Sequence, residues 1–413
     1  MKKTATLTSF PKSKINILLL EGINPSAIGE FKKSAYSNIQ LEDKALSENE
    51  LAERIGEVHI LGIRSKTNVT KKILDRAEKL IGIGCFCIGT DQVDLNAATD
   101  AGITVFNSPY SNTRSVAELV LAESIMLIRR IPERNEAAHR GDWLKDAKGS
   151  HELRGKTLGI IGYGHIGSQV SVLAESLGMR VIFYDIEPKL PLGNATAFDS
   201  LSKLLKEADI VSLHVPETQQ TENMMTAPRI KQMKPGSILL NLSRGRVVDL
   251  PALREALLSG QVKGAAIDVF PTEPKSKNEK FVSPLQNIPN VILTPHIGGS
   301  TLEAQENIGF DVSRKLVSLL DTGATVGSHS VPPLSLPMQH NTHRLLHIHK
   351  NLPGVLSELN GMLSALNVNI VGQYLKTNDK IGYVVLDVEK SASKKAFEEI
   401  KKVKHTIKTR ILY

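Results

Sequence analysis

The sequence predicts an α/β protein with two doubly wound parallel-sheet domains and a small C-terminal βαββαβ domain. Short apolar runs alternate with helical patterns over the first hundred residues, and a second such series begins at Thr157. A stretch rich in Gly, Ser, Thr and Pro at 321–337 then precedes a final segment, 338–413. Strict alternation of strand and helix is typical of parallel sheets, because each crossover needs a connecting helix. A chain of 413 residues is long enough for two or three domains.

The first series contains a run of short apolar segments, each followed by a helical pattern. We expect strands at 15–20, 58–63, 80–86 and 103–106, and helices at 25–33, 70–79 and 95–101. A longer amphipathic pattern at 115–130 predicts a helix that connects two domains. We expect it to end near Pro132, because proline interrupts a helix.

The second series has the same alternation, and the final segment has the order βαββαβ. In the second series we expect strands at 158–161, 180–184, 210–214, 237–242, 264–269 and 291–294, and helices ending at 177, beginning at 201, at 251–259 and at 303–320. In the final segment we expect strands at 343–349, 369–376, 381–388 and 406–412, and helices at 353–366 and 393–402.

Composition excludes several classes of protein. No apolar window approaches the roughly 18 residues that span a bilayer. We do not expect Lys2 and Lys3 to begin a signal peptide, because Lys12 and Lys14 interrupt the stretch where its apolar region would lie. We therefore expect a cytoplasmic protein with no membrane partner. Its two cysteines, Cys85 and Cys87, are expected to be buried thiols, since further ligands for a metal or redox pair are missing.

The net charge of +8 is concentrated near the C-terminus. Residues 390–413 contain seven lysines and one arginine against two glutamates, or +6. Without interleaved aromatic residues this segment gives little reason to expect nucleic-acid binding. We expect it to be a solvated face.

A glycine motif follows the first strand of the second series. Gly162, Gly164 and Gly167 have the spacing GxGxxG between a strand and a helix, and Asp185 ends the next strand. This context predicts a dinucleotide site, with the pyrophosphate on the helix N-terminus and the acidic residue on the ribose. A carboxylate at this position repels a 2′-phosphate and so favours NAD over NADP. The alternative is a tight turn with no ligand.

Three polar residues follow three predicted strands: Arg244, Glu273 and His296. Singly they fit a surface ion pair, a loop carboxylate and a loop histidine. Beside a nicotinamide they form a hydride-transfer set, because a cation binds and polarises a carbonyl and an acid protonates the alkoxide. Glu273 would orient His296 and raise its pKa.

Several segments together resemble the D-isomer-specific 2-hydroxyacid dehydrogenases. They are Ser243-Arg-Gly245, Asp268 with Pro271-Thr-Glu-Pro274, and Thr294-Pro-His-Ile-Gly-Gly299. Ile83-Gly-Cys-Phe-Cys87, Asn112-Thr-Arg-Ser-Val-Ala-Glu118 and the C-terminal segment extend the likeness to the bacterial branch that carries an ACT domain. The resemblance covers nearly the whole chain.

The resemblance implies a fold and a division into domains. It implies a flavodoxin-like substrate lobe at 1–111 and 300–330, a Rossmann NAD lobe at 112–299 and a ferredoxin-like ACT domain at 338–413, with substrate and cofactor in the cleft between the lobes. It also implies a homotetramer.

The resemblance implies roles for particular residues. Arg244, Glu273 and His296 would be catalytic. The cofactor would be NAD, bound by Gly162, Gly164, His165, Ile166, Gly167, Asp185, Leu242, Ser243, Arg244, Asp268, His296, Gly298 and Gly299. The substrate would be bound by Arg64, Ser65, Lys66 and Asn112, with Trp143 and Lys145 reaching in from a neighbouring subunit. For Arg64 and Lys66, an exposed strand end is the alternative interpretation.

In this branch the ACT domain binds serine between two copies, through positions that match His349, Asn351 and Asn369. His343, His347 and His349 share a strand and could suggest a metal, but no carboxylate or cysteine accompanies them, so we expect no metal site. One departure concerns the hinge. The branch usually has a Gly-Gly pair before the first ACT strand, whereas this chain has Gln339-His-Asn-Thr342, which restricts the backbone more.

The implied activity is NAD-dependent oxidation of 3-phospho-D-glycerate to 3-phosphohydroxypyruvate, the first step of the phosphorylated route to serine, with feedback inhibition by L-serine. One alternative is another 2-hydroxy acid such as 2-hydroxyglutarate, glyoxylate or hydroxypyruvate. Arg64 and Lys66 favour a substrate with a second anionic end but do not separate phosphate from carboxylate. Another alternative, a non-catalytic NADH-binding co-repressor, is disfavoured by the C-terminal module.

Overall fold

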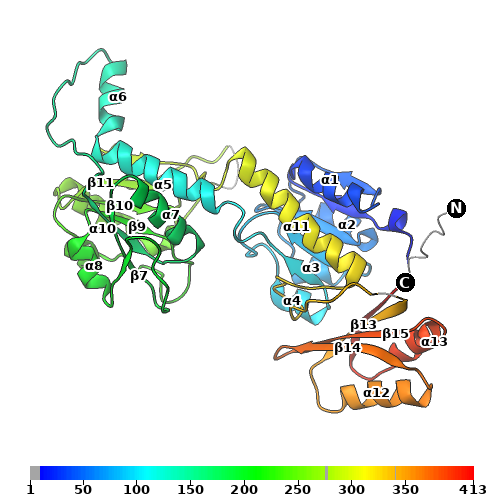
Figure 1. The fold of residues 1–413 in the computed structure, drawn as a ribbon. Coiled ribbons are helices and arrows are strands. Elements are labelled where there is room, and N and C mark those ends of the chain that lie inside the picture. Colours follow the sequence, from blue (N-terminus) through cyan, green and yellow to red (C-terminus); the bar gives the residue numbers. More distant parts are fainter. Residues whose placement is uncertain (1–9, 275–277, 340) are drawn as a thin grey trace, which may run out of the picture. The chain divides into compact units, whose positions relative to one another are not determined.

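The computed structural model describes residues 10–274, 278–339 and 341–413 (Figure 1). The chain forms two compact units. Unit 1 combines the chain up to Ser111 with the chain from Gln305 onward, and unit 2 is Asn112–Ala304. None of the helices in the described residues is long and apolar enough to cross a membrane.

The N-terminal part of unit 1 is a five-stranded parallel sheet with helices on both faces (Figure 1). The strand order β2-β1-β3-β4-β5 confirms the flavodoxin-like arrangement. The strands are β1 (Ile17–Leu19), β2 (Ile39–Leu41), β3 (Ile60–Ile63), β4 (Gly82–Cys85) and β5 (Thr104–Phe106). One face is covered by α2 (Glu48–Arg54), α3 (Lys71–Leu74) and α4 (Leu95–Asp100), and the other by α1 (Pro25–Lys33) and α11 (Leu302–Thr322).

Two local expectations in this part were incomplete. The helix expected at 70–79 ends at Leu74, because beyond it the backbone bonds tighten to three-residue turns such as Ala77 N–H to the Leu74 carbonyl. Strand β2 and helix α2 were not expected, although Ser47 and Glu50 form a capping box at the start of α2. Strand β2 is only three residues long and half-buried to exposed, so it has no apolar run to predict it.

Cys85 and Cys87, at the end of β4 and just beyond it, are both free thiols. Cys85 is buried at the end of β4 and Cys87 is half-buried. Burial raises the pKa of both thiols, that of Cys87 to about 11. Neither thiol is therefore a ready thiolate nucleophile at neutral pH.

Unit 2 is a seven-stranded parallel sheet in the order β12-β11-β10-β9-β6-β7-β8, which confirms the expected doubly wound fold. The strands are β6 (Thr157–Ile161), β7 (Arg180–Tyr184), β8 (Thr196–Ala197), β9 (Ile210–Leu213), β10 (Ser237–Asn241), β11 (Val262–Ile267) and β12 (Val291–Leu293). One face is covered by α5 (Thr113–Ile128) and α7 (His165–Ser176), and the other by α8 (Leu201–Glu207), α9 (Ala227–Gln232) and α10 (Leu250–Leu258).

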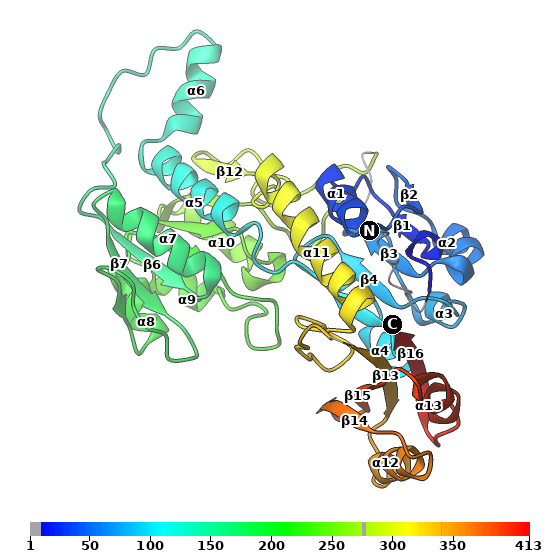
Figure 2. The same ribbon diagram turned by 45° about the vertical axis from the view of Figure 1, so that its right-hand side comes forward.

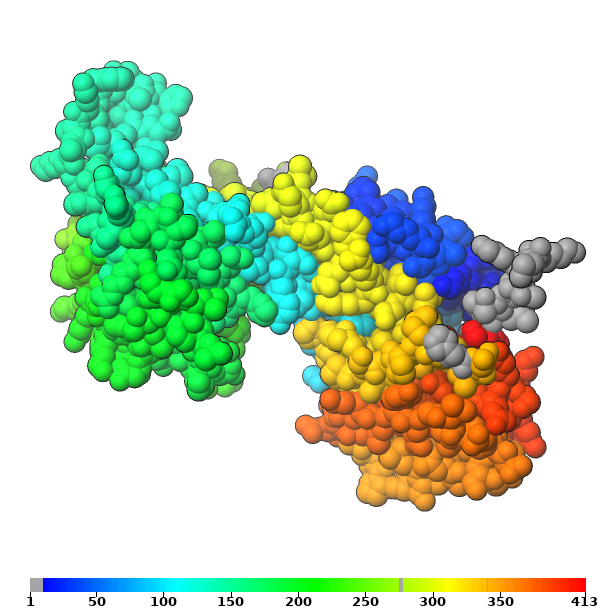
Figure 3. Space-filling model, in the orientation of Figure 1, coloured from blue at the N-terminus to red at the C-terminus, as the bar shows by residue number. Residues whose placement is uncertain are grey.

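The interpretation of Pro132 was wrong. Helix α5 ends at Ile128, and Pro132 lies in the first turn of a new helix, α6 (Ile131–His139). Arg130 adopts φ 53° between the two helices, and proline is tolerated in a first turn because its missing N–H needs no helical partner there. Figure 3 shows the segment that contains α6 standing out from the rest of unit 2.

The C-terminal part of unit 1 is an antiparallel sheet in the order β14-β15-β13-β16, which confirms the βαββαβ arrangement (Figure 2). It consists of β13 (Thr342–Lys350), α12 (Val355–Ala365), β14 (Ile370–Thr377), β15 (Ile381–Glu389), α13 (Ser393–Ile400) and β16 (Thr406–Leu412). Both helices bury their apolar sides on one face of this sheet. Within the segment that departs from a Gly-Gly pair, His340 lies outside the described residues.

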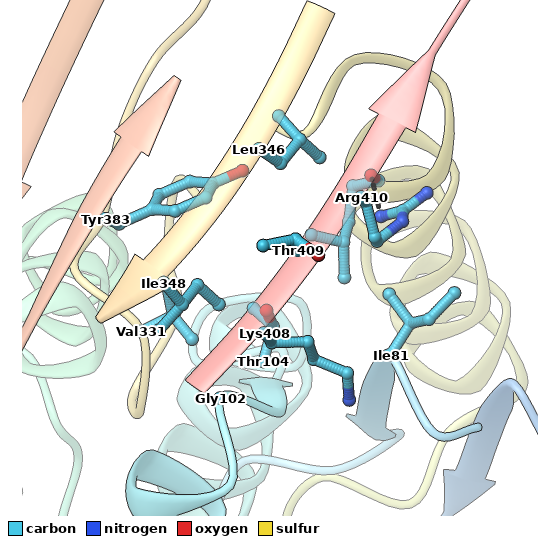
Figure 4. A pocket seen from close by; sticks show the side chains of 11 residues that line it. Ile81, Gly102, Thr104, Val331, Leu346, Ile348, Tyr383, Lys408, Thr409 and Arg410 are labelled. Atoms are coloured by element: carbon cyan, nitrogen blue, oxygen red, sulfur yellow. Dashed lines mark hydrogen bonds between the residues drawn. The ribbon is translucent and has the colours of Figure 1, made fainter. Parts of the chain in front are cut away.

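The expectation that residues 390–413 form only a solvated face was wrong. Lys408 Nζ donates to the Leu80 carbonyl, and Arg410 donates to the carbonyls of Leu319 and Leu320 at 3.1 Å, near the C-terminus of α11. Figure 4 shows both side chains leaving β16 beside a cavity of about 20 Å³. Cations are stabilised at a helix C-terminus by its unpaired carbonyls, so part of the C-terminal charge holds the small sheet against the rest of unit 1.

Candidate active site

The glycine motif forms a tight loop between β6 and α7. Gly162 has φ 92°, and a Cβ placed there would lie 2.4 Å from the His214 carbonyl oxygen. A Cβ at Gly167 would lie 2.2 Å from the Gly162 carbonyl oxygen, whereas the space around Gly164 is open. Only glycine fits the two crowded positions, and the open one allows a ligand to approach the backbone. His165 and Ile166 begin α7, as a pyrophosphate site at a helix N-terminus requires.

Asp185 follows β7 and is fixed beside this loop. One carboxylate oxygen accepts from the Tyr163 backbone N–H at 2.7 Å, and the other accepts from Glu187 N–H at 3.0 Å. Each oxygen keeps a further lone pair for the hydroxyls of a ribose. The crowded glycines, the open Gly164 and the placed carboxylate together fit a bound dinucleotide.

The loop after β10 is held by a residue that the sequence interpretation missed. Asn241 is fully buried, and its side-chain oxygen accepts from the Ser243 backbone N–H and hydroxyl, while its amide donates to the Arg244 carbonyl at 3.0 Å. These bonds fix the backbone of Leu242, Ser243 and Arg244. A polar residue at the end of the apolar run Ile238-Leu-Leu240 was the available signal.

Asp268 organises the loop after β12. It is 1% exposed, and its carboxylate accepts from the Thr294 hydroxyl at 2.6 Å and from the backbone N–H groups of Ile297 and Gly298 at 2.8 Å. Gly299 next to it lies against Asn112, since a Cβ there would be 2.2 Å from the Asn112 amide nitrogen. Thr294 was quoted in the motif but not recognised as a partner of Asp268.

His296 and Glu273 form the expected pair. Nδ1 of His296 lies 3.0 and 3.1 Å from the two carboxylate oxygens of Glu273, which also accepts from the Phe270 backbone N–H. Because an ionised carboxylate only accepts, Nδ1 carries the hydrogen and Nε2 is left for a substrate. The hydrogen bond that His296 donates to Glu273 raises the pKa of His296, and burial opposes this shift. Burial acts to raise the pKa of Glu273, but His296 and, through charge, Arg244 outweigh it and lower this pKa.

Unit 2 therefore brings the three proposed catalytic residues and the proposed cofactor residues to one edge of its sheet. They follow the carboxyl ends of β6, β7, β10, β11 and β12. In open parallel sheets this edge is where ligands bind. The arrangement can bind a dinucleotide, hold an anion at Arg244 and exchange a proton at His296.

The cationic loop of unit 1 follows β3 and is fixed by Glu21, which the sequence interpretation missed. The largely buried carboxylate of Glu21 accepts from the backbone N–H groups of Arg64, Lys66 and Thr67 at 2.9 to 3.2 Å. The side chains of Arg64 and Lys66 form no hydrogen bond or ion pair within the described part of the chain. They are thus available to an anion, and Ser65 between them is exposed.

Trp143 and Lys145 lie elsewhere. They are exposed on the segment after α6, and Trp143 is 83% accessible. The same segment contacts Arg130, through the Lys148 carbonyl, and Lys263 at the start of β11, through the Gly149 carbonyl.

The expected serine residues lie at two opposite ends of the small sheet. His349 and Asn351 are at the end of β13, where His349 pairs with Gly382, whereas Asn369 precedes Ile370, which lies level with Val388 and His343. Six strand steps of about 3.4 Å separate His343 from His349, or about 20 Å. One copy of this domain cannot bring the three side chains around one small molecule.

The chain is similar to known proteins in both sequence and fold. Residues 121–298 match the family model of the D-isomer specific 2-hydroxyacid dehydrogenase NAD binding domain, and residues 345–408 match an AHAS small subunit-like ACT domain. Over 98% of this chain, the sequence is 56% identical to a D-3-phosphoglycerate dehydrogenase of Haemophilus influenzae and 54% identical to one of Escherichia coli, and each match covers 99% of the relative. Among solved structures, D-2-hydroxyisocaproate dehydrogenase is 27% identical with a TM-score of 0.69, covering 76% of this chain and 100% of that one.

Proposed function

Because the chain belongs to the D-isomer specific 2-hydroxyacid dehydrogenase family, we propose that it oxidises 3-phospho-D-glycerate at C2 with NAD and yields 3-phosphohydroxypyruvate. This is the first step of the phosphorylated route to L-serine. The observation that carries the proposal is identity above 50% over the full length of D-3-phosphoglycerate dehydrogenases. The hydrogen-bonded pair His296–Glu273 next to Arg244 supplies the chemistry.

The proposed roles follow from the geometry of unit 2. His296 accepts the proton of the C2 hydroxyl at Nε2, and Glu273 stabilises the resulting imidazolium through Nδ1. Arg244 binds the substrate carboxylate and polarises the developing carbonyl. The chemistry that NAD supplies when bound is acceptance of the hydride from C2. The C2–H and O–H bonds break, the C=O bond forms, and the proton remains on His296.

The second anionic end of the substrate is assigned to the loop of Arg64, Ser65 and Lys66, with Asn112. In support, Glu21 fixes the loop backbone while both cationic side chains are left without a protein partner in the described residues. A half-buried arginine and an exposed lysine on a fixed loop suit a phosphate or a carboxylate. We further propose that Trp143 and Lys145 complete the site of a neighbouring subunit in a homotetramer.

We propose that L-serine inhibits the enzyme by binding between two ACT domains. The distance of about 20 Å between the ends of β13 supports this, because His349 and Asn351 of one copy can meet only the Asn369 of another. A two-fold symmetric pair of ACT domains satisfies this condition if the His349 end of one sheet lies against the Asn369 end of the other. Gel filtration at several concentrations tests the oligomeric state.

The proposed domain division is 1–111 with 300–330 for the substrate lobe, 112–299 for the NAD lobe and 338–413 for the ACT domain, and the proposed compartment is the cytoplasm. One assay tests the activity: NADH appearance is followed with 3-phosphoglycerate, 2-hydroxyglutarate and other 2-hydroxy acids, with and without L-serine. The highest kcat/KM is expected with 3-phosphoglycerate. A higher kcat/KM with 2-hydroxyglutarate contradicts the proposed substrate, and no turnover with any of them contradicts an enzyme.

A further inference from the structure

Unit 2 has a second concave site at the opposite edge of its sheet. A cavity of about 90 Å³ is lined by residues that precede or begin the strands β6, β9, β10 and β11. The proposed NAD and catalytic residues follow the carboxyl ends of β6, β10 and β11 and of their neighbours β7 and β12. In a parallel sheet the two edges are separated by the length of the strands, so this cavity is not part of the dehydrogenase site.

The cavity carries an excess of positive charge. Lys156, Lys234 and Lys263 line it together with His151, and Asp209 is the one carboxylate among the lining residues. The three lysines minus the aspartate give +2 at neutral pH before His151 is counted. This excess is local and differs from the C-terminal charge of unit 1.

The Asp209 carboxylate already has two hydrogen-bond donors. Asp209 accepts from Lys234 Nζ at 2.7 Å and from the Thr157 backbone N–H at 2.8 Å. Burial acts to raise the pKa of Asp209, but these two bonds outweigh it and keep the pKa low. The Lys156 ammonium forms no hydrogen bond or ion pair with the described residues, and Lys263 Nζ donates to the neutral Gly149 carbonyl at 2.6 Å. Two ammonium groups therefore face the cavity without an anionic partner bonded to them.

Lys263 lies among other positive charges. Its pKa is lowered first by burial, then by repulsion from Arg130, while Glu133 opposes the effect and Lys156 adds to it. Arg130 is itself paired with Glu133, so that carboxylate is shared. An added anion would relieve the repulsion between the cations.

A buried hydroxyl provides an independent observation. Ser237 lines the cavity at the start of β10 and is 2% exposed, yet its Oγ has no hydrogen-bond partner among the described residues. A buried hydroxyl without a partner is unfavourable and needs an explanation. Gly236 next to it has φ 77°, and a Cβ placed there would have no atom within 4 Å, which leaves space for a ligand beside the hydroxyl.

We propose that this cavity binds a phosphoryl group, either as free phosphate or as the phosphate of a small metabolite whose remainder extends into solvent. The oxygens would accept from the ammonium groups of Lys156 and Lys263 and from the Ser237 hydroxyl. Lysine binds phosphate as a point charge, and a cavity of about 90 Å³ has room for a phosphoryl group. The proposal does not depend on the dehydrogenase activity.

The test is calorimetric titration of the full-length protein with inorganic phosphate at constant ionic strength. The variant Lys156→Gln/Lys263→Gln is expected to bind one phosphate fewer per chain, or to bind it at least tenfold more weakly, with turnover unchanged. The matched control Lys203→Gln/Lys206→Gln removes the same charge from α8, outside the cavity, and is expected to titrate like the wild type. Phosphate at the substrate site contributes equally to all three proteins.

Ser237→Ala is a second variant that keeps every charge. It is expected to weaken phosphate binding severalfold while the melting temperature without phosphate stays equal or rises, because an unpartnered hydroxyl is removed. A parallel titration with glycerol 2-phosphate separates the sources: tighter binding than inorganic phosphate indicates a metabolite, and weaker binding indicates free phosphate. Unchanged phosphate titration in both cavity variants would overturn the proposal. Dissociation of Lys156→Gln/Lys263→Gln into smaller oligomers would also overturn it, in favour of a subunit contact.

Discussion

Glu123 offers a quantitative test of the energetics of unit 2. It lies on α5, is 1% exposed, and neither carboxylate oxygen has a hydrogen-bond partner among the described residues. Burial, followed by the charge of Asp268, raises the pKa of Glu123 to about 8. The folded protein therefore keeps this carboxyl protonated at neutral pH, whereas the unfolded chain loses the proton near pH 4.5.

The sign and size of the effect follow from proton linkage. The raised pKa leaves stability intact below about pH 4.5, and stability then falls as the pH rises toward the folded pKa, because the folded state binds the extra proton. A pKa of about 8 in place of 4.5 corresponds to about 5 kcal/mol lost above both values. Roughly 2 kcal/mol of this falls between pH 6 and pH 8.

The perturbation is Glu123→Gln, which keeps the shape and removes the titration. We expect wild-type unit 2 to lose about 2 kcal/mol more stability than Glu123→Gln between pH 6 and pH 8. Urea unfolding is followed by circular dichroism, and the transition that moves to higher urea on addition of NAD is assigned to unit 2. Glu118→Gln, on the exposed side of the same helix, is expected to keep the wild-type slope. Equal pH slopes in wild type and Glu123→Gln would refute the reasoning.

Three further predictions concern activity and regulation. His296→Ala is expected to lower kcat at least about a hundredfold, measured as NADH formation, and near wild-type turnover contradicts its role. Glu273→Gln is expected to lower the pKa of His296. The acid limb of the pH profile of kcat/KM for oxidation then moves to lower pH, because His296 stays an unprotonated base there. An acid limb that does not move contradicts the pairing of His296 with Glu273. Asn351→Ala is expected to abolish inhibition by L-serine with catalysis intact, which a serine titration checks against Asn360→Ala on α12.

Glu21 is expected to affect substrate binding and not turnover, in contrast to His296. Glu21→Gln weakens three bonds to the backbone of residues 64–67, so the KM for 3-phosphoglycerate should rise roughly tenfold with kcat within about twofold. A fall in kcat with constant KM contradicts it.

The sequence by itself determined the fold class, the order of the main strands and helices, and the nature of the nucleotide loop. The alternation of apolar runs and helical patterns predicted both parallel sheets, because parallel strands require crossovers. Gly162 and Gly167 predicted the tight loop, because their backbone positions leave no space for a Cβ. Such patterns are local, so they can be recognised without knowing what packs against them.

Only the tertiary structure decided which polar groups meet. Glu21 bonds to a loop more than forty residues later, and Asn241 supports Arg244 from inside the sheet. Lys408 and Arg410 belong to a basic segment that composition alone assigned to solvent, yet carbonyls near the end of α11 and at Leu80 bind them. A charge run has the same composition whether water or a helix terminus satisfies it, and the difference arises only when distant segments pack together.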